Sequence, residues 1–318
     1  MTERLIPNTF IPIDKIFPVE QIARNVEGEI ITPTDEIMFD WMLTDACNFY
    51  CDYCHPNIAV HKNEPAVHGK SSSEIAQSFL NVGRPIHLFM SGGEPTMFPN
   101  FVDFCETIIS NGNRISMNTN LSLREVVADF SHRIDPKQVG QINAALHLME
   151  RKRQHMTLED FATDIILLQE KGFPVDAFYV LYPPLLGRFD QDAAYLKRLG
   201  VERVAGKIFK GPYNGKIYPM GYSEEDRAII KGYQNSSYKV TSDYLDDKQY
   251  KFIGRKCTAG AKFFKVNVDG NVQRCPADKE SYGNIYQGTF NPDTRAKPCV
   301  TRKVLSVSQC NTFVQEPT

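Results

Sequence analysis

The sequence has no long run of basic residues. It carries 36 Lys and Arg against 38 Asp and Glu, a formal net charge of −2 over 318 residues. A protein that grips a nucleic-acid backbone normally presents a basic patch or stripe. We therefore expect no nucleic-acid partner.

Long apolar runs are missing as well. No segment reaches the ~20 apolar residues that span a bilayer, and the N-terminus MTERLIPNTFIPIDKIF lacks the basic start and apolar stretch of a secretory signal. The expected location is the reducing cytoplasm, without a membrane partner. There the eight cysteines are expected to be metal ligands or free thiols rather than disulfides.

Apolar and β-branched stretches alternate with helical patterns along most of the chain. Strands are predicted at 37–44, 86–90, 114–118, 141–147, 175–181 and 202–209. Helices are predicted at 72–82, 98–111, 122–131, 157–171, 189–199 and 223–233. The helix at 157–171 has the best-defined ends, because Thr157 and Asp160 resemble a capping box and Gly172 follows it.

This order predicts an α/β fold of parallel strands joined by crossover helices. Pattern alone leaves a partial (β/α)6 barrel and a doubly wound sheet open, but either places the chemistry at the C-terminal ends of the strands. After about residue 235 the pattern changes, and KFFKVNVDGNVQRC at 262–275 predicts a β-hairpin around Asp269 and Gly270. We predict an N-terminal extension (1–36), a barrel (37–235) and a small C-terminal module (236–318).

Three cysteines follow the first predicted strand within eight residues, as Cys47-Asn-Phe-Tyr-Cys51-Asp-Tyr-Cys54. Three thiolates on one loop can converge on one metal centre, and in a four-iron cubane they leave one iron without a protein ligand. Structural zinc is the alternative, but it requires four protein ligands and usually two C-x₂-C pairs. Only one such pair lies in this loop.

The C-x₃-C-x₂-C spacing, with an aromatic residue before the last cysteine, resembles the signature of the radical S-adenosylmethionine (SAM) superfamily. Ser91-Gly92-Gly93-Glu94-Pro95 follows the second strand and resembles that family's GGEP motif. Met117-Asn118-Thr119-Asn120 follows the third strand, where the family often has a ribose-contacting motif. The resemblance covers roughly residues 37–210.

The resemblance implies a [4Fe–4S] cluster on Cys47, Cys51 and Cys54, with SAM chelating the open iron through its amino and carboxylate groups. It implies that one electron from the cluster cleaves SAM into methionine and a 5′-deoxyadenosyl radical, which takes a hydrogen atom from the substrate. The residues it assigns to SAM binding are Tyr53, Gly92, Gly93, Glu94, Pro95, Asn118 and Asn120. Independently of the family, two glycines let a backbone approach a ligand closely, and Asn side chains can bond ribose hydroxyls.

Four of the remaining cysteines, Cys257, Cys275, Cys299 and Cys310, fall in the C-terminal tail. Four thiolates suit either an all-cysteine [4Fe–4S] cluster or zinc. CTAGAKFFKVNVDGNVQRCP resembles the start of a SPASM or twitch domain, and four cysteines rather than about seven favour twitch, with one auxiliary [4Fe–4S] cluster. Cys105 lies in the helical pattern FVDFCETII and is expected to be a buried core thiol.

Candidate catalytic residues lie near the ends of strands four, five and six: His147, Tyr182 and Lys207, with Lys210 close by. His147 and Tyr182 could exchange protons with substrate or contact SAM, although a packed histidine and a packed tyrosine are equally consistent. The segment 203–222 is rich in Lys, Gly and Tyr, and is expected either to bind an anionic or sugar-like substrate or to be a solvated loop.

The favoured function is a radical SAM enzyme of oxidoreductase type that dehydrogenates or epimerises a small polar metabolite. Its expected partners are that metabolite and an electron donor such as flavodoxin or ferredoxin. Radical modification of a peptide is the second hypothesis, although the 1–36 segment is short for a leader-peptide-binding domain. A non-catalytic zinc-binding scaffold is the third, and iron and sulfide analysis distinguishes it.

Overall fold

The computed structural model describes residues 34–54, 69–234, 239–241, 252 and 254–300. The chain divides into two compact units. The larger unit comprises Trp41–Leu80 and His87–Lys248, and the smaller comprises Met1–Asp40, Asn81–Ile86 and Gln249–Thr318. The units alternate along the sequence, so the chain crosses from one to the other within the first strand. The consecutive domain boundaries expected from the sequence stay a prediction.

Parallel strands form the centre of the larger unit. Their order is β1-β2-β3-β4-β5-β6-β9. The bounds are β1 (Ile37–Thr44), β2 (Ile86–Gly92), β3 (Arg114–Thr119), β4 (Val139–Ala145), β5 (Val175–Leu181), β6 (Val204–Ile208) and β9 (Lys239–Thr241). The six strands β1 to β6 confirm the predicted α/β fold and have the arrangement of a partial barrel.

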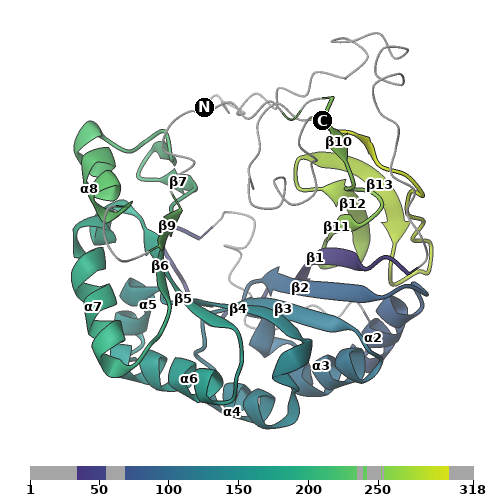
Figure 1. The fold of residues 1–318 in the computed structure, drawn as a ribbon, viewed down its shortest axis with the longest axis horizontal. Coiled ribbons are helices and arrows are strands. Elements are labelled where there is room, and N and C mark those ends of the chain that lie inside the picture. Colours follow the sequence, from purple (N-terminus) through teal and green to yellow (C-terminus); the bar gives the residue numbers. More distant parts are fainter. Residues whose placement is uncertain (1–33, 55–68, 235–238, 242–251, 253, 301–318) are drawn as a thin grey trace. The chain divides into compact units, whose positions relative to one another are not determined.

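Helices follow most of these strands and lie along the outer side of the curved sheet (Figure 1). Their bounds are α2 (Ser72–Leu80), α3 (Phe101–Ser110), α4 (Arg124–Arg133), α5 (Leu148–Arg153), α6 (Leu158–Glu170), α7 (Phe189–Leu199) and α8 (Glu224–Gln234). A short hairpin, β7 (Gly211–Tyr213) and β8 (Lys216–Tyr218), follows β6. The sequence pattern missed α5, β7, β8 and β9.

The predicted capping box of α6 is confirmed. The Thr157 hydroxyl accepts a hydrogen bond from the Asp160 amide at 3.1 Å, and the Asp160 carboxylate accepts one from the Thr157 amide at 2.9 Å. Gly172 beyond the helix has a φ of +85°, a conformation that glycine adopts without strain. Local sequence therefore defines this helix closely.

The two faces of the sheet differ in environment. On β5, Tyr179 is buried, contacts the Phe189 ring of α7 edge to face with the ring centroids 5.4 Å apart, and donates a hydrogen bond to Asp192 of α7 at 2.8 Å. The strand alternates strictly between buried and half-buried residues, so its neighbours Phe178 and Val180 lie on the opposite face. That inner face is where a parallel α/β sheet can hold a ligand, at the C-terminal strand ends.

The core of the larger unit is aromatic beneath β1. Trp41 is fully buried and packs against Phe79 of α2 at 4.6 Å and Phe104 of α3 at 5.6 Å. Cys105 of α3 is also fully buried, which confirms that it is a core thiol. This packing fixes the end of β1, from which the three-cysteine loop departs.

The smaller unit contains the predicted hairpin. Strands β11 (Phe263–Val266) and β12 (Asn271–Cys275) pair antiparallel, with Val266 opposite Val272. Gly270 in the turn has a φ of +82°, and a Cβ there would lie 2.5 Å from the Tyr286 ring. A third strand, β13 (Asp278–Asn284), extends the hairpin and was not expected.

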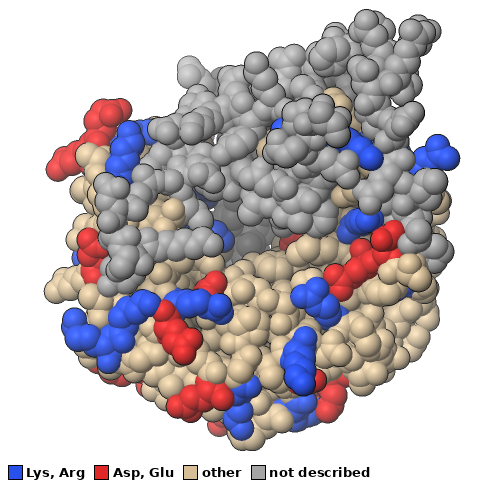
Figure 2. Space-filling view, viewed as in Figure 1, with Lys and Arg blue, Asp and Glu red and all other residues tan. Residues whose placement is uncertain are grey.

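Charges of both signs are interspersed on the coloured surface in Figure 2, without a large field of one sign in that view. This distribution agrees with the near-zero net charge. In the described part of the chain, no helix combines the length and the hydropathy needed to cross a membrane.

Candidate active site at the three-cysteine loop

The loop Cys47–Cys54 leaves the C-terminal end of β1 with all three thiols half-buried. Burial raises the pKa of Cys47 to about 12, opposed by a hydrogen bond from the Phe49 amide and assisted by the charges of Glu94 and Cys54. Burial, followed by the charges of Cys54 and Cys47, also raises the pKa of Cys51. The three thiols therefore influence one another electrostatically, and a positive centre is needed to keep them all as thiolates.

Three neighbouring thiolates repel one another, and soft sulfur ligands of this kind suit the irons of an iron–sulfur cluster. The described residues contain no ready-made set of three His, Cys, Asp or Glu side chains at metal-binding geometry. Cys54, the last cysteine of the loop, is the final described residue before position 69. The fit accordingly rests on ligand type, on spacing and on the mutual charge effects of the three thiols.

The two glycines after β2 allow close contact between two stretches of backbone. A Cβ at Gly92 would lie 2.1 Å from the Thr44 carbonyl oxygen, and one at Gly93 would lie 1.9 Å from that of Ala46. The Gly93 amide donates to Thr44 at 2.8 Å and the Glu94 amide to Ala46 at 2.8 Å. The glycines therefore fasten the end of β2 to the start of the cysteine loop, a requirement that sequence reasoning had attributed to a ligand.

Glu94 is buried, with 1% of its surface exposed. One carboxylate oxygen accepts hydrogen bonds from the Thr96 amide (3.1 Å), the Thr96 hydroxyl (2.6 Å) and the Thr119 hydroxyl (2.6 Å). The other accepts one from the Asn120 amide at 2.7 Å. Four donors match the acceptor capacity of a carboxylate, so Glu94 joins the end of β2 to the end of β3.

Helix α5 holds the cysteine loop from the other side. Arg153 donates to the Tyr50 carbonyl at 3.0 Å and pairs with Asp52 at 2.8 Å. Gln154 donates to the Asn48 carbonyl at 2.7 Å. These contacts fix three successive parts of the loop between Cys47 and Cys54.

Arg151 is buried beneath the same loop, with 1% of its surface exposed. It donates to the carbonyl of Leu146 at 2.8 Å and to that of Asn120, and its guanidinium lies 5.7 Å from the Phe49 ring. Burial lowers its pKa to about 10. It therefore joins the ends of β3 and β4 to the loop.

Tyr53 lies against two of the predicted catalytic residues. Its hydroxyl is 2.6 Å from Nδ1 of His147, and its ring is 4.3 Å from that of Tyr182. His147 precedes α5 with a φ of +47°. Burial, assisted by the charges of Arg151 and Lys207, lowers the pKa of His147 to about 4, so the ring is neutral at neutral pH.

A family model covers both the three-cysteine loop and the Gly92-Gly93-Glu94 turn. The model of the radical SAM superfamily matches residues 41–183, a span that contains the three cysteines, the glycine pair and Glu94. Residues 41–183 are a radical SAM domain. A domain of this superfamily implies SAM and a [4Fe–4S] cluster as cofactors, and members of the superfamily such as GTP 3′,8-cyclase are enzymes.

Relatives extend over different parts of the chain. An uncharacterised protein of Methanocaldococcus jannaschii is 24% identical over 279 residues, which cover 83% of this chain and 94% of that protein. GTP 3′,8-cyclase of Pasteurella multocida is 35% identical over 141 residues, 42% of this chain. The match spans only 40% of the cyclase.

Solved structures share the fold. Streptococcus suis SuiB bound to S-adenosylmethionine has a TM-score of 0.55 at 11% identity, covering 85% of this chain and 66% of SuiB. The structure of anSMEcpe with bound AdoMet has a TM-score of 0.52 at 16% identity, covering 82% of this chain and 78% of that one. At these identities the likeness concerns the fold of the two chains and nothing finer.

The radical SAM domain brings most of the sequence-predicted site residues to one end of its sheet. The side chain of Asn118 accepts from Asn143 at 2.8 Å, and that of Asn120 donates to Asn48 at 3.1 Å and accepts from Ser122. Pro95 begins a short 3₁₀ turn and is buried. Their predicted contacts with SAM stay predictions, as do those of Tyr53, the glycines and Glu94.

Sequence reasoning missed Arg151, Arg153 and Gln154. They belong to the polar run ERKRQ, which has no apolar periodicity to predict a helix. Their position directly after His147, at a strand end, was the available signal.

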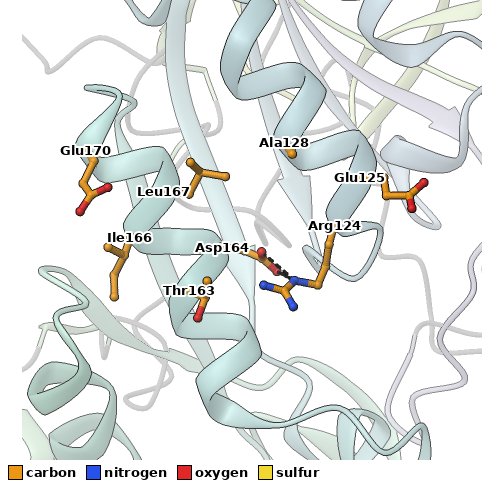
Figure 3. Close-up of a pocket in the computed structure, with 8 residues that line it drawn as sticks. All are labelled: Arg124, Glu125, Ala128, Thr163, Asp164, Ile166, Leu167 and Glu170. Atoms are coloured by element: carbon orange, nitrogen blue, oxygen red, sulfur yellow. Dashed lines mark hydrogen bonds and ion pairs between the residues drawn. The ribbon is translucent and has the colours of Figure 1, made fainter.

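A separate hollow lies between α4 and α6 on the helical side of the sheet (Figure 3). Arg124 and Asp164 point toward one another across it and form an ion pair of 3.0 Å. Its other lining residues are the apolar Ala128, Ile166 and Leu167 and the polar Glu125, Thr163 and Glu170. It shares none of its lining residues with the cysteine loop.

In the smaller unit, Cys257 and Cys299 belong to one buried cluster, and Cys275 packs against it. A hydrogen bond from Cys299 lowers the pKa of Cys257 to about 7. Arg274, 3% exposed, pairs with Asp278 at 3.0 Å and donates to the Ala259 and Pro298 carbonyls. Three of the four predicted auxiliary ligands thus lie together, while Cys310 lies outside the described residues.

The contacts of Arg153 give a first testable expectation. An Arg153→Ala variant should release iron faster than the wild type under a chelator, because the loop loses its bonds at Tyr50 and Asp52. The pair with Asp52 is about half exposed and should contribute less than about 1 kcal/mol to the free energy of unfolding. The Glu150 carboxylate, which is 3% exposed, also loses its cation, so release is compared per folded molecule. Loss of the 400 nm-region absorbance over time measures release.

Arg133→Ala is the matched control, because Arg133 forms ion pairs with Asp103 and Asp129 away from the loop. It should release iron at the wild-type rate. Equal rates for all three proteins would show that α5 does not hold the loop.

Proposed function

We propose that this protein is a radical SAM oxidoreductase that removes a hydrogen atom from a small polar metabolite, with dehydrogenation or epimerisation as the outcome. The observation that carries the proposal is the three-thiol loop, fastened to the Gly92-Gly93-Glu94 turn at the C-terminal end of a parallel sheet. Bound on Cys47, Cys51 and Cys54, a [4Fe–4S] cluster would supply the electron that cleaves SAM. The chain itself supplies orientation, a buried environment and the electrostatics of the site.

The residues around the loop suit radical chemistry. Tyr53, Tyr182 and neutral His147 form a packed wall beside the thiols, and burial raises the pKa of Tyr53 and of Tyr182. Such a wall excludes water, which protects a reactive intermediate from side reactions. The tyrosines stay protonated at neutral pH, so they can donate a hydrogen bond rather than act as bases.

A small polar substrate is favoured by the match to GTP 3′,8-cyclase, whose name specifies a small polar metabolite. Peptide modification is the second candidate, because SuiB has been solved with its precursor peptide SuiA and shares this fold. We retain flavodoxin or ferredoxin as the proposed electron donor. The reducing cytoplasm stays the proposed compartment, on the strength of the free thiols.

The experiment uses reconstituted protein, SAM and a reductant under anaerobic conditions, with deuterated polar metabolites and short peptides as candidate substrates. Substrate-dependent 5′-deoxyadenosine that carries deuterium identifies both the substrate and the abstracted hydrogen. Deuterium from peptides alone would support the second candidate. If a deuterated compound is converted but the 5′-deoxyadenosine carries no deuterium, hydrogen abstraction is contradicted.

We further propose a twitch-like auxiliary [4Fe–4S] cluster on Cys257, Cys275, Cys299 and Cys310. Its support is the packing of the first three cysteines in one buried cluster and the lowered pKa of Cys257, a sign of a stabilised thiolate. Four thiolates would fill every iron, so this cluster would accept an electron from the substrate rather than bind it.

Iron content tests the second cluster. The wild type should hold about eight irons per chain, and a Cys47→Ala, Cys51→Ala, Cys54→Ala variant about four, because each cubane has four. A Cys257→Ala, Cys275→Ala, Cys299→Ala variant should also hold about four. If the Cys47→Ala, Cys51→Ala, Cys54→Ala variant is folded but holds no iron, the auxiliary cluster is refuted. Zinc bound to that variant instead of iron would support the zinc alternative.

A further inference from the structure

Lys207 projects from β6 onto the inner face of the sheet. Its neighbour Gly206 faces α7, because a Cβ there would lie 3.2 Å from the Phe189 ring. Lys207 therefore points the other way, where its ammonium lies 5.6 Å from the Phe178 ring centroid. Its side chain is exposed to solvent on that face.

The surroundings of Lys207 are electropositive. Burial and the charge of Lys207 lower the pKa of Lys210 to about 8, and Lys207 also contributes to the low pKa of His147. Burial lowers the pKa of Lys207 itself. The surrounding protein displaces part of the water around this ammonium, which is therefore less well hydrated than a free one, and a bound anion would offset that loss.

The carboxylates on flanking elements are engaged elsewhere. Asp176 of β5 pairs with Arg203, and Asp52 of the cysteine loop pairs with Arg153. Glu150 of α5 pairs with Arg153 as well. In the described part of the chain, Lys207 accordingly forms no ion pair, and its ammonium lies over the face of the Phe178 ring.

We propose that Lys207 binds an anionic group, a carboxylate or a phosphate, on the substrate. The inference rests on the proposed function, because it places that substrate at the sheet end that carries the cysteine loop. An ammonium held over an aromatic face is an anchor for one terminal anion. The packed wall of Tyr53 and Tyr182 would then lie beside the reacting part of the molecule.

The experiment measures anion binding directly. The probes are inorganic phosphate, followed by ³¹P relaxation, and acetate labelled at its carboxyl carbon, followed by ¹³C relaxation, with the oxidised full-length protein. Saturable broadening of either probe is expected for the wild type. A charge-assisted contact is worth ~1.5–3 kcal/mol, so Lys207→Met should weaken binding roughly tenfold or more.

Two variants make the result specific. Lys207→Arg keeps the charge and should keep the broadening, which also shows that a loss in Lys207→Met is not a general folding defect. Lys171→Met removes an exposed lysine just after α6 and should behave as the wild type. Broadening by phosphate alone assigns a phosphate anchor, and broadening by acetate alone assigns a carboxylate anchor.

Equal broadening for the wild type and Lys207→Met, or none with either probe, would overturn the proposal. It would also be overturned if SAM alone displaced both probes, because Lys207 would then serve the carboxylate of the cofactor. SAM cleavage by the wild type is a separate measurement. Its absence would refute the proposed function and leave the anion measurement to be judged independently.

Discussion

A Cys51→Ala variant is expected to form 5′-deoxyadenosine from SAM no faster than a reaction without protein. Cys51 is the middle cysteine of the loop, and its thiol interacts electrostatically with both Cys47 and Cys54. Three thiolates are the minimum set for a cubane with one open iron, so the loss of any one removes the site. Chromatography of the products after anaerobic reduction measures the yield.

Cys105→Ala is the matched control, because it removes a cysteine of the same unit that is fully buried in α3. It should lose some stability through the small cavity but keep the wild-type yield of 5′-deoxyadenosine per folded molecule. If Cys51→Ala and the wild type gave equal yields, the loop would not be the site of SAM cleavage.

The second large effect is expected at Glu94. Replacing it with Ala should lower the free energy of unfolding of the radical SAM domain by about 4 kcal/mol or more. The reason is that four buried donors, from Thr96, Thr119 and Asn120, lose their acceptor, and each buried unsatisfied donor costs ~1–3 kcal/mol. Denaturant unfolding followed by circular dichroism measures the change.

Glu106→Ala is the control, since its carboxylate is half exposed on α3 and pairs with Arg133. It should cost less than about 1 kcal/mol. Glu94→Gln separates the two roles of Glu94. If the Glu94 carboxylate is purely structural, folded Glu94→Gln protein should bind SAM with wild-type affinity. If the carboxylate contacts the SAM amine, folded Glu94→Gln protein should bind SAM more weakly. A change at Glu94 no larger than at Glu106 would contradict the network.

Structural features that depend on a few adjacent residues were predicted correctly. The Thr157–Asp160 capping box, the turn at Asp269-Gly270 and the six strands depend on local propensity and periodicity, which the sequence displays directly. The cysteine loop was located for the same reason, because its spacing is short. The radical SAM domain model independently covers it.

Features that depend on tertiary partners were missed or explained differently. Helix α5 has too few apolar residues to be predicted, and tertiary contacts to the cysteine loop accompany it. Gly92 and Gly93 were assigned to ligand approach, whereas their closest neighbours are the carbonyls of Thr44 and Ala46. Arg274, which joins the flanks of Cys257 and Cys299, carries no local signal at all.

The binding of SAM at the three-cysteine loop is tested most directly by electron paramagnetic resonance of the reduced protein. To isolate the loop's signal, the Cys257→Ala, Cys275→Ala, Cys299→Ala variant is used, and SAM labelled with ¹⁵N at its amino group is added. We expect the spectrum of the reduced cluster to change on addition of SAM and to show coupling to the labelled nitrogen, because three thiolates leave one iron open. A reduced-cluster spectrum that saturating SAM leaves unchanged would contradict the account.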